Sequence, residues 1–275
     1  MAITYYMLQI SPVLFFILIV GGCALLAGLG TLLFRKVVKL KVLRSHNEVT
    51  GFLFLAIASF YALLLSFIVL VVWEQLNETI GVVSKEGSSA MTLYRDIKYY
   101  PDTAQTRPLK TAYLNFVFDV VDDEFPRMAR MQQTRQTSES FDKVFVHMAR
   151  LDPKTPMENL LVAEMMTQLN TLAADRGQRL SSMDAEISPA LWMPILLGAL
   201  ITILCAMLLD IEQRRHHFLL NSLLGAFIGI FLFVIIVLDH PYSGSNGLKP
   251  DSYMQIFTSE KWSKELHDKT ISPIK

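Results

Sequence analysis

Cysteine is scarce in this sequence: only Cys23 and Cys205 occur among 275 residues. Both lie inside long apolar runs, so they form no disulfide framework and give no information about the redox compartment. We interpret them as small apolar side chains that face lipid or a neighbouring helix.

Motifs for metals, cofactors and catalysis are also missing. The sequence has no Cys pair at metal-ligand spacing, no HExxH helix, no EF-hand loop and no Gly-rich phosphate or dinucleotide loop. Between Glu74 and Ser188, His147 is the single histidine and cysteine is absent, so we find no Ser-His-Asp or Cys-His arrangement. The 25 basic and 25 acidic side chains balance, which gives no net attraction to nucleic acid. We therefore expect no enzyme, no cofactor, no metal and no nucleic-acid partner.

Long apolar runs, in contrast, are abundant. Uncharged stretches occupy Pro12–Phe34, Gly51–Trp73, Leu191–Leu209 and Phe218–Leu238. About 20 apolar residues of helix cross a bilayer, and within lipid the backbone must satisfy its own hydrogen bonds. The first run is too long for a secretory h-region and no cleavage site ends it before Arg35, so we interpret it as a retained helix. The sequence predicts an all-α integral membrane protein with four transmembrane helices.

Four regions follow from this pattern. We expect a first transmembrane hairpin at 1–73, a polar insert at 74–188, a second transmembrane hairpin at 189–238, and a C-terminal loop with a short helix at 239–275. The second span has no linker after it, so its helix should continue into the insert through Glu74 and Glu78. In the tail, Tyr253–His267 is typical of a short interfacial or bundle-docking helix.

The insert is expected to be a helical bundle. Apolar positions recur at spacings of three and four residues, and breaks are expected at Pro101–Asp102, Gln132–Ser140 and Asp152–Lys154. Pro126 should kink or end a helix. These breaks separate about four helices. The two helical stripes are Leu109, Ala112, Tyr113, Phe116 and Val120, and then Leu161, Met165, Leu169, Leu172, Arg176, Leu180 and Met183.

The basic residues predict the orientation. The connection Arg35–Thr50 is rich in Lys and Arg, and the connection Asp210–His217 carries Arg214 and Arg215. Short loops of this kind stay in the cytoplasm. The N-terminus, the insert and the C-terminal tail are therefore expected on the outer side, although a basic loop can also bind lipid headgroups.

The second span holds the candidate pore-lining residues. Ser59, Tyr61 and Ser66 could line a narrow path, and phenylalanines could form a hydrophobic gate. Alternatively, these polar side chains hydrogen-bond to neighbouring helices, and acids at the end of the helix simply meet water. A ring of carboxylates at a pore mouth would favour cations. The candidate residues are Phe52, Ser59, Phe60, Ser66, Phe67, Glu74 and Glu78.

Other polar groups and small residues have structural interpretations. Asn47 or Ser45 is expected to cap the second span, with His46 and Glu48 beside it. The acidic run Asp122–Glu124 lacks the geometry of a calcium site and is expected to face solvent. Small residues should allow close helix packing, most simply within one subunit. They are Ala24 and Gly28 in the first span and Gly225 and Gly229 in the last.

Over most of its length, the chain resembles a bacterial membrane family catalogued as a bestrophin-like domain of unknown function. The likeness rests on HNEVTGFLFLAIASFYALLLSFIVLVVWEQ, SPALWMPILLGA and VLDHPYSGSNGLKPDSY, and it is strongest at His46–Asn47, Tyr61, Trp73–Glu74, Trp192 and Leu238–Gly244. Bestrophins proper are pentameric anion channels, so the resemblance implies an oligomeric channel. The expected outward insert and the missing acidic calcium clasp depart from bestrophins.

Together these observations favour a homo-oligomer in the bacterial inner membrane, in contact with lipid and small ions, whose second span lines an ion path. The rival hypothesis is a non-conducting sensor or scaffold whose bundle binds a partner or ligand.

Overall fold

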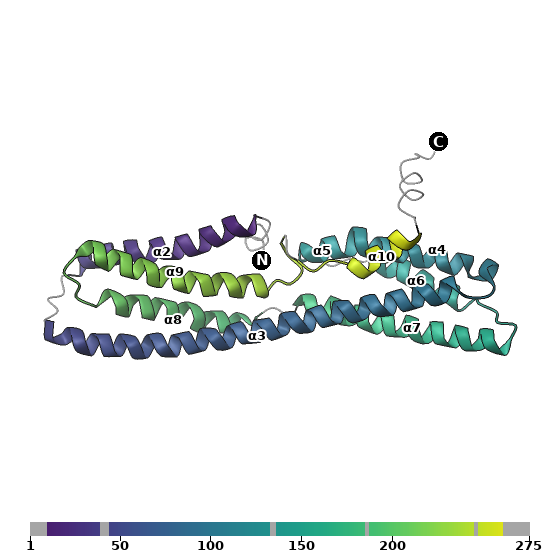
Figure 1. The fold of residues 1–275 in the computed structure, drawn as a ribbon, viewed down its shortest axis with the longest axis horizontal. Coiled ribbons are helices and arrows are strands. Elements are labelled where there is room, and N and C mark those ends of the chain that lie inside the picture. Colours follow the sequence, from purple (N-terminus) through teal and green to yellow (C-terminus); the bar gives the residue numbers. More distant parts are fainter. Residues whose placement is uncertain (1–9, 39–43, 133–135, 185–186, 245–246, 261–275) are drawn as a thin grey trace, which may run out of the picture. The chain divides into compact units, whose positions relative to one another are not determined.

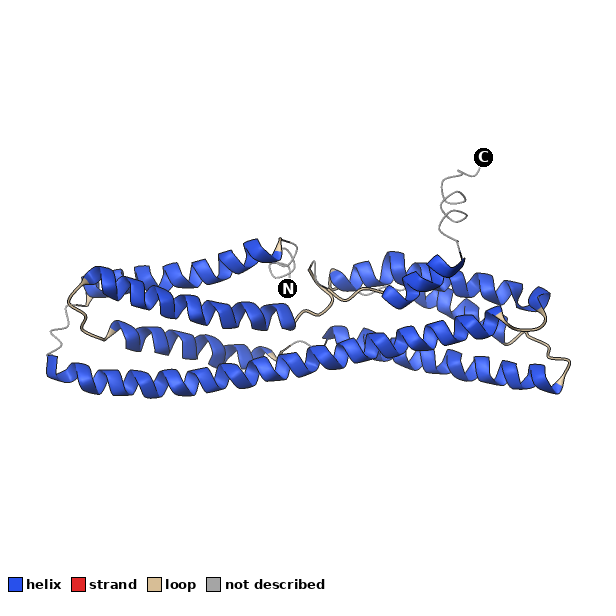
Figure 2. Cartoon of the chain, viewed as in Figure 1, coloured by secondary structure: helices blue, strands red, loops and turns tan. Residues whose placement is uncertain are grey.

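The structure is a computed structural model that describes residues 10–38, 44–132, 136–184, 187–244 and 247–260. All of its described secondary structure is helical (Figure 2). The long helices are α2 (Pro12–Val37), α3 (Arg44–Lys98), α7 (Pro156–Ser181), α8 (Pro189–Met207) and α9 (Arg214–Leu238). The shorter ones are α4 (Thr103–Asp119), η1 (Val120–Glu124), α5 (Phe125–Ala129), α6 (Gln136–Met148), η2 (Ser182–Asp184) and α10 (Asp251–Glu260).

Four of these helices, α2, α3, α8 and α9, are long and apolar enough to cross a membrane. They contain the four predicted apolar runs, so the prediction of an all-helical chain with four span-length helices is confirmed. α3 has no break after Trp73 and extends to Lys98. Asn47 does not cap it, because the helix already begins at Arg44.

The chain divides into two compact units. Unit 1 comprises Met1–Leu76 and Glu186–Ser245, and unit 2 comprises Asn77–Ala185 and Asn246–Lys275. Helix α3 therefore supplies residues to both units, and the C-terminal helix α10 belongs to unit 2.

Within unit 1, the most extensive helix pair is α2 with α9, which lie side by side although they come from opposite ends of the chain (Figure 1). Helix α8 packs on α9 and, over a shorter length, on α2. Many large apolar side chains on all four helices stay exposed, as expected for helices whose outer faces meet lipid.

Unit 2 buries the earlier of the two predicted helical stripes completely and the later one in part, since Leu161, Leu180 and Met183 are only partly buried. The earlier stripe, on α4 and η1, is buried throughout, and Met165, Leu169 and Leu172 of α7 are fully buried. The breaks at Pro101–Asp102 and Asp152–Lys154 separate helices as expected, whereas the break at Gln132–Ser140 is only partly right because α6 begins at Gln136.

Pro126 is accompanied by a change of helix type. Residues Val120–Glu124 form a π-helical turn, and the N–H of Phe125 donates to the carbonyl of Val120. Proline has no N–H to donate, and a π-turn is one way in which a helix accommodates such a break in its ladder. The turn ends on Glu124, whose side chain it directs into the interior of unit 2.

Candidate functional site

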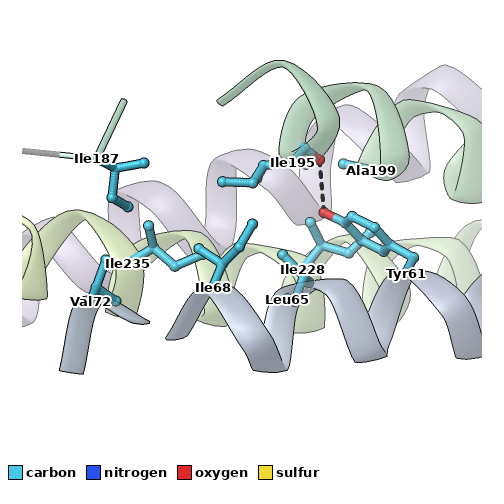
Figure 3. Close-up of a cluster of buried hydrophobic side chains, with 9 residues drawn as sticks. All are labelled: Tyr61, Leu65, Ile68, Val72, Ile187, Ile195, Ala199, Ile228 and Ile235. Carbon is cyan, nitrogen blue, oxygen red and sulfur yellow. Dashed lines mark hydrogen bonds between the residues drawn. The ribbon is translucent and has the colours of Figure 1, made fainter. Parts of the chain in front are cut away.

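Helix α3 has one covered face in unit 1. Tyr61, Leu65, Ile68 and Val72 recur at spacings of three and four residues and are buried against α8 and α9 (Figure 3). The Tyr61 hydroxyl donates to the carbonyl of Ile195 at 3.0 Å. Gly198 makes room for the ring, because a Cβ at this position would lie 2.6 Å from Cε2 of Tyr61. Tyr61 therefore packs within the chain and hydrogen-bonds to a neighbouring helix, which is the second of the two roles that the sequence left open for it.

The opposite face of α3 is uncovered. The side chains of Phe52 and Phe60 are each 75% exposed and that of Phe67 is 59% exposed. Positions seven residues apart complete two helical turns, so they share a face. All seven candidate pore-lining residues are exposed. Intervals of seven relate Phe52, Ser59 and Ser66, and also Phe60, Phe67 and Glu74, and Glu78 lies one turn beyond Glu74.

Both serines on this face are satisfied by their own helix. The Ser59 hydroxyl donates to the carbonyl of Leu55 at 2.7 Å, and the Ser66 hydroxyl donates to that of Ala62 at 2.9 Å. Neither serine needs a neighbouring helix or a water for its donor. The uncovered face of α3 thus carries aromatic rings and hydroxyl groups among exposed aliphatic side chains such as Leu63 and Leu70, and it ends in carboxylates.

The small residues bring α2 and α9 together. A Cβ at Gly225 would lie 2.5 Å from the carbonyl oxygen of Cys23 and 2.7 Å from Cβ of Ala27, and one at Gly229 would lie 2.9 Å from Cα of Val20. Gly28 lies against Ser222 and Phe218 of α9. Ala24 is only partly buried, and the buried alanine of α2 is Ala27, which the sequence argument did not select.

A polar cluster joins the ends of the unit 1 helices. The side chain of Asn47 exchanges two hydrogen bonds with the backbone of Asp210, at 2.9 and 2.8 Å. Arg35 donates to the carbonyl of Ile211 at 2.9 Å and contacts Nδ1 of His217 at 3.4 Å. The two basic connections predicted from the sequence therefore meet in the structure, and Asn47 acts as a cross-link.

Within the Leu238–Gly244 segment, Asp239 has a clear structural role. Its buried carboxylate accepts a hydrogen bond from the backbone N–H of Ile187 at 2.7 Å. This contact ties the end of α9 to the segment that enters α8. The segment ends at Gly244, whose φ of 83° lies in the left-handed region that glycine adopts without strain.

Unit 2 contains a buried charge cluster that sequence reasoning missed. It consists of Glu86 of α3, Glu124 of η1, Arg176 and Arg179 of α7, and Tyr253 of α10, which we call the ion-pair cluster. Arg176 donates to Glu124 at 2.6 Å, and Arg179 donates to Glu86 at 3.1 Å and also binds Glu124. Tyr253 donates to Glu86 at 2.6 Å.

The cluster corrects the assignment of the acidic run. Asp122 is exposed as expected, but Glu124 is fully buried. Such burial is tolerated because each carboxylate faces a guanidinium. The one sequence signal was Arg176, a charged residue placed in the apolar stripe of α7.

The pKa values in the cluster follow from these contacts. Burial by itself would raise the pKa of Glu124, but the charge of Arg179 and the hydrogen bonds and charge of Arg176 outweigh it and lower that pKa below its ordinary value. Burial and the charge of Glu86 raise the pKa of Tyr253 well above its ordinary range. Glu124 is therefore ionised and Tyr253 is a neutral donor at neutral pH.

Unit 2 should consequently lose stability in acid. Because the pKa of Glu124 is lower in the folded protein than in the unfolded chain, its stabilising contribution is present above the unfolded pKa and is lost as the pH falls through the folded pKa. We expect the melting temperature of the purified protein in detergent to decrease when the pH is lowered below about 4. Circular dichroism melts over a pH series would measure this. In the variant Glu124→Gln, the melting temperature should depend less on pH in this acid range. An unchanged dependence would show that Glu124 does not cause the loss of stability.

These features define a multi-pass helical membrane protein with a helical second unit. Its family is shown by comparison: a family model described as the bestrophin-like domain matches residues 21–253, so the chain belongs to the bestrophin-like family. No curated protein and no solved structure matches the chain. Among the described residues, no group of three or more His, Cys, Asp or Glu side chains is placed to hold a metal ion.

Proposed function

We propose that this protein is a homo-oligomeric ion channel in which the uncovered face of α3 lines the conducting path. The observation that carries the proposal is the division of α3 into two faces. Tyr61, Leu65 and Val72 pack inside the subunit, whereas the seven candidate pore-lining residues are exposed in the part of the chain that the structure describes. A path lined by an outward-facing strip needs further copies of the chain to enclose it. The proposed conduction therefore requires the proposed oligomer.

The chemistry of the strip suits a gated path. Phenylalanine rings narrow a pore and gate it by excluding water, and hydroxyl groups between them offer sites to a passing ion. Glu74 and Glu78 would form rings of carboxylates at one mouth, which favours cations there. Membership of a bestrophin-like family supports a channel in general terms.

The proposed orientation places both basic connections in the cytoplasm. The spans then form two hairpins, and unit 2 and both termini lie on the outer side of a bacterial inner membrane. The meeting of Arg35 and Asn47 with the Asp210–Ile211 backbone supports a common side for the two connections. The positive-inside rule supplies the direction.

Cysteine accessibility tests the lining of the path. In a background with Cys23→Ala and Cys205→Ala, we expect Ser59→Cys and Ser66→Cys to react with a water-soluble thiol reagent and to lose at least about tenfold in conductance, because a charged adduct blocks a narrow pore. Single-channel recording in planar bilayers, combined with mass spectrometry of the adduct, measures both effects.

The matched control is Leu223→Cys on α9, a position that is 58% exposed in the single chain but lies on another helix. It should stay unreactive because lipid covers it. Equal protection of Ser59→Cys and Leu223→Cys would place the α3 strip in lipid or in a dry interface and would refute the pore.

The second candidate function is a non-conducting sensor or scaffold whose helical bundle binds a ligand. The observation that favours it is a hollow in unit 2 between α4 and α6. Current through purified protein in bilayers separates the two functions, since a sensor of this kind passes none.

A further inference from the structure

The hollow between α4 and α6 has the size of a small-molecule site. Its volume is about 610 Å³, within the range of roughly 300 to 1,000 Å³ that is usual for such sites. The lining includes Arg107, Ala112 and Asp119 of α4 and Ser140, Lys143 and His147 of α6. Ala112 and Ser140 are buried and form the bottom of the hollow, and the charged side chains form its more exposed sides.

The two helices run antiparallel, which orders the charges along the hollow. Gln105, near the start of α4, exchanges hydrogen bonds at 3.1 and 3.0 Å with the backbone of Asp152, just after α6. Ser140, near the start of α6, instead lies close enough to Asp119, at the end of α4, for its hydroxyl to lower the pKa of that carboxyl. Arg107 and His147 therefore lie toward one end, and Asp119 lies about 18 Å along α4 from Arg107 at 1.5 Å per residue.

The basic side chains of the hollow differ from those of the ion-pair cluster. In that cluster, the guanidinium groups of Arg176 and Arg179 are matched by carboxylates. In the part of unit 2 that the structure describes, the side chains of Arg107, Lys143 and His147 form no hydrogen bond or ion pair, although Lys143 lies close enough to Asp119 to act on its charge. Three basic groups thus line one cavity that holds a single carboxylate.

We propose that this hollow binds a small organic anion through a carboxylate or phosphate group. Arg107 is the principal anchor, because a guanidinium donates two parallel hydrogen bonds to either oxyanion. Lys143 and His147 add donors, and Asp119 would accept a hydrogen bond only from a hydroxyl or ammonium group of a ligand long enough to reach it from Arg107. Burial raises the pKa of Asp119, with the Ser140 hydrogen bond opposing this effect, which agrees with a half-buried carboxyl that faces a cavity.

This proposal does not depend on conduction, because binding is measured directly. Isothermal titration of the full chain in nanodiscs, at neutral pH and low salt, would use three probes: inorganic phosphate, succinate and glutamate. We expect at least one probe to bind with a Kd of about 1 mM or tighter. Binding of phosphate alone would identify a phosphate site, and preference for succinate or glutamate would identify a carboxylate site.

The matched variants are Arg107→Gln and Arg150→Gln. Arg150 is an exposed arginine just beyond α6 that does not line the hollow. Arg107→Gln should weaken binding at least about tenfold, and Arg150→Gln should leave it unchanged. Absence of binding by all three probes, or equal effects of the two arginine variants, would overturn the proposal.

Discussion

Replacing Arg179 by methionine should destabilise unit 2 by about 3 to 5 kcal/mol, the usual cost of breaking a buried ion pair from one side. The side chain of Arg179 is fully buried and binds both Glu86 and Glu124. Without it, Glu86 retains the hydroxyl of Tyr253 and Glu124 retains Arg176. Glu86 would then be buried without a guanidinium partner, so it must take up a proton or become exposed.

Hydrogen exchange of the full chain would measure this effect. A loss of about 3 to 5 kcal/mol corresponds to a drop of roughly 10² to 4 × 10³ in protection, and the peptides of α7 and α10 should show it. The control is Arg127→Met, which removes a more exposed i,i+4 pair with Asp123 and should cost less than about 1 kcal/mol. If both variants lowered protection equally, the ion-pair cluster would not stabilise unit 2. Adding Glu86→Gln should recover part of the loss, because it removes the carboxylate that Arg179→Met leaves without a guanidinium partner.

Replacing Gly225 by valine should separate α2 from α9. The new Cβ would lie within 2.5 Å of the Cys23 carbonyl oxygen, which is a backbone atom and cannot turn away as a side chain can. Overpacking of this kind costs about 1 to 3 kcal/mol, which for a chain of this size lowers the melting temperature by roughly 3 to 10 °C. Thermal unfolding in detergent, followed by intrinsic fluorescence and monodispersity, would record the shift.

The control for this change is Gly22→Val on α2, where a Cβ would meet nothing within 4 Å. It places the same side chain in a span-length helix without a steric conflict. We expect its melting temperature to stay within about 1 to 2 °C of the parent, since exposed substitutions away from packing contacts have small effects. Similar melting temperatures for both variants would show that the α2–α9 contact is looser than the structure describes.

The ion-pair cluster shows where sequence reasoning failed. Glu124 lies in an acidic run that the sequence argument assigned to solvent, and neither Glu86 nor Arg179 was selected from the sequence. The partners Glu86 and Arg179 are 93 positions apart, and Arg176 and Glu124 are 52 apart. No local pattern encodes a contact over such distances. A charged residue inside an apolar stripe, as Arg176 is in α7, was the available hint that a buried partner exists.

The face of α3 illustrates a second limit. Tyr61 and Ser59 are both polar residues in the same apolar run, so amino-acid composition does not distinguish their roles. The structure separates them, because Tyr61 points into the packing of α8 and α9 whereas Ser59 is exposed and bonds to its own helix. Helical spacing groups residues into faces, but it does not say which face another helix covers.

The sequence by itself determined the four span-length helices, the continuation of the second one beyond Trp73, and the helical stripes of unit 2, of which the earlier is fully buried. These features depend on local hydrophobicity and on spacings of three and four residues, which are properties of the chain before it folds. Only the tertiary structure decided that α2 pairs with α9, that one strip of α3 stays uncovered, and that Arg176 and Arg179 meet Glu86 and Glu124. Those outcomes depend on which distant helices come into contact, because burial and charge pairing are set by neighbours in space.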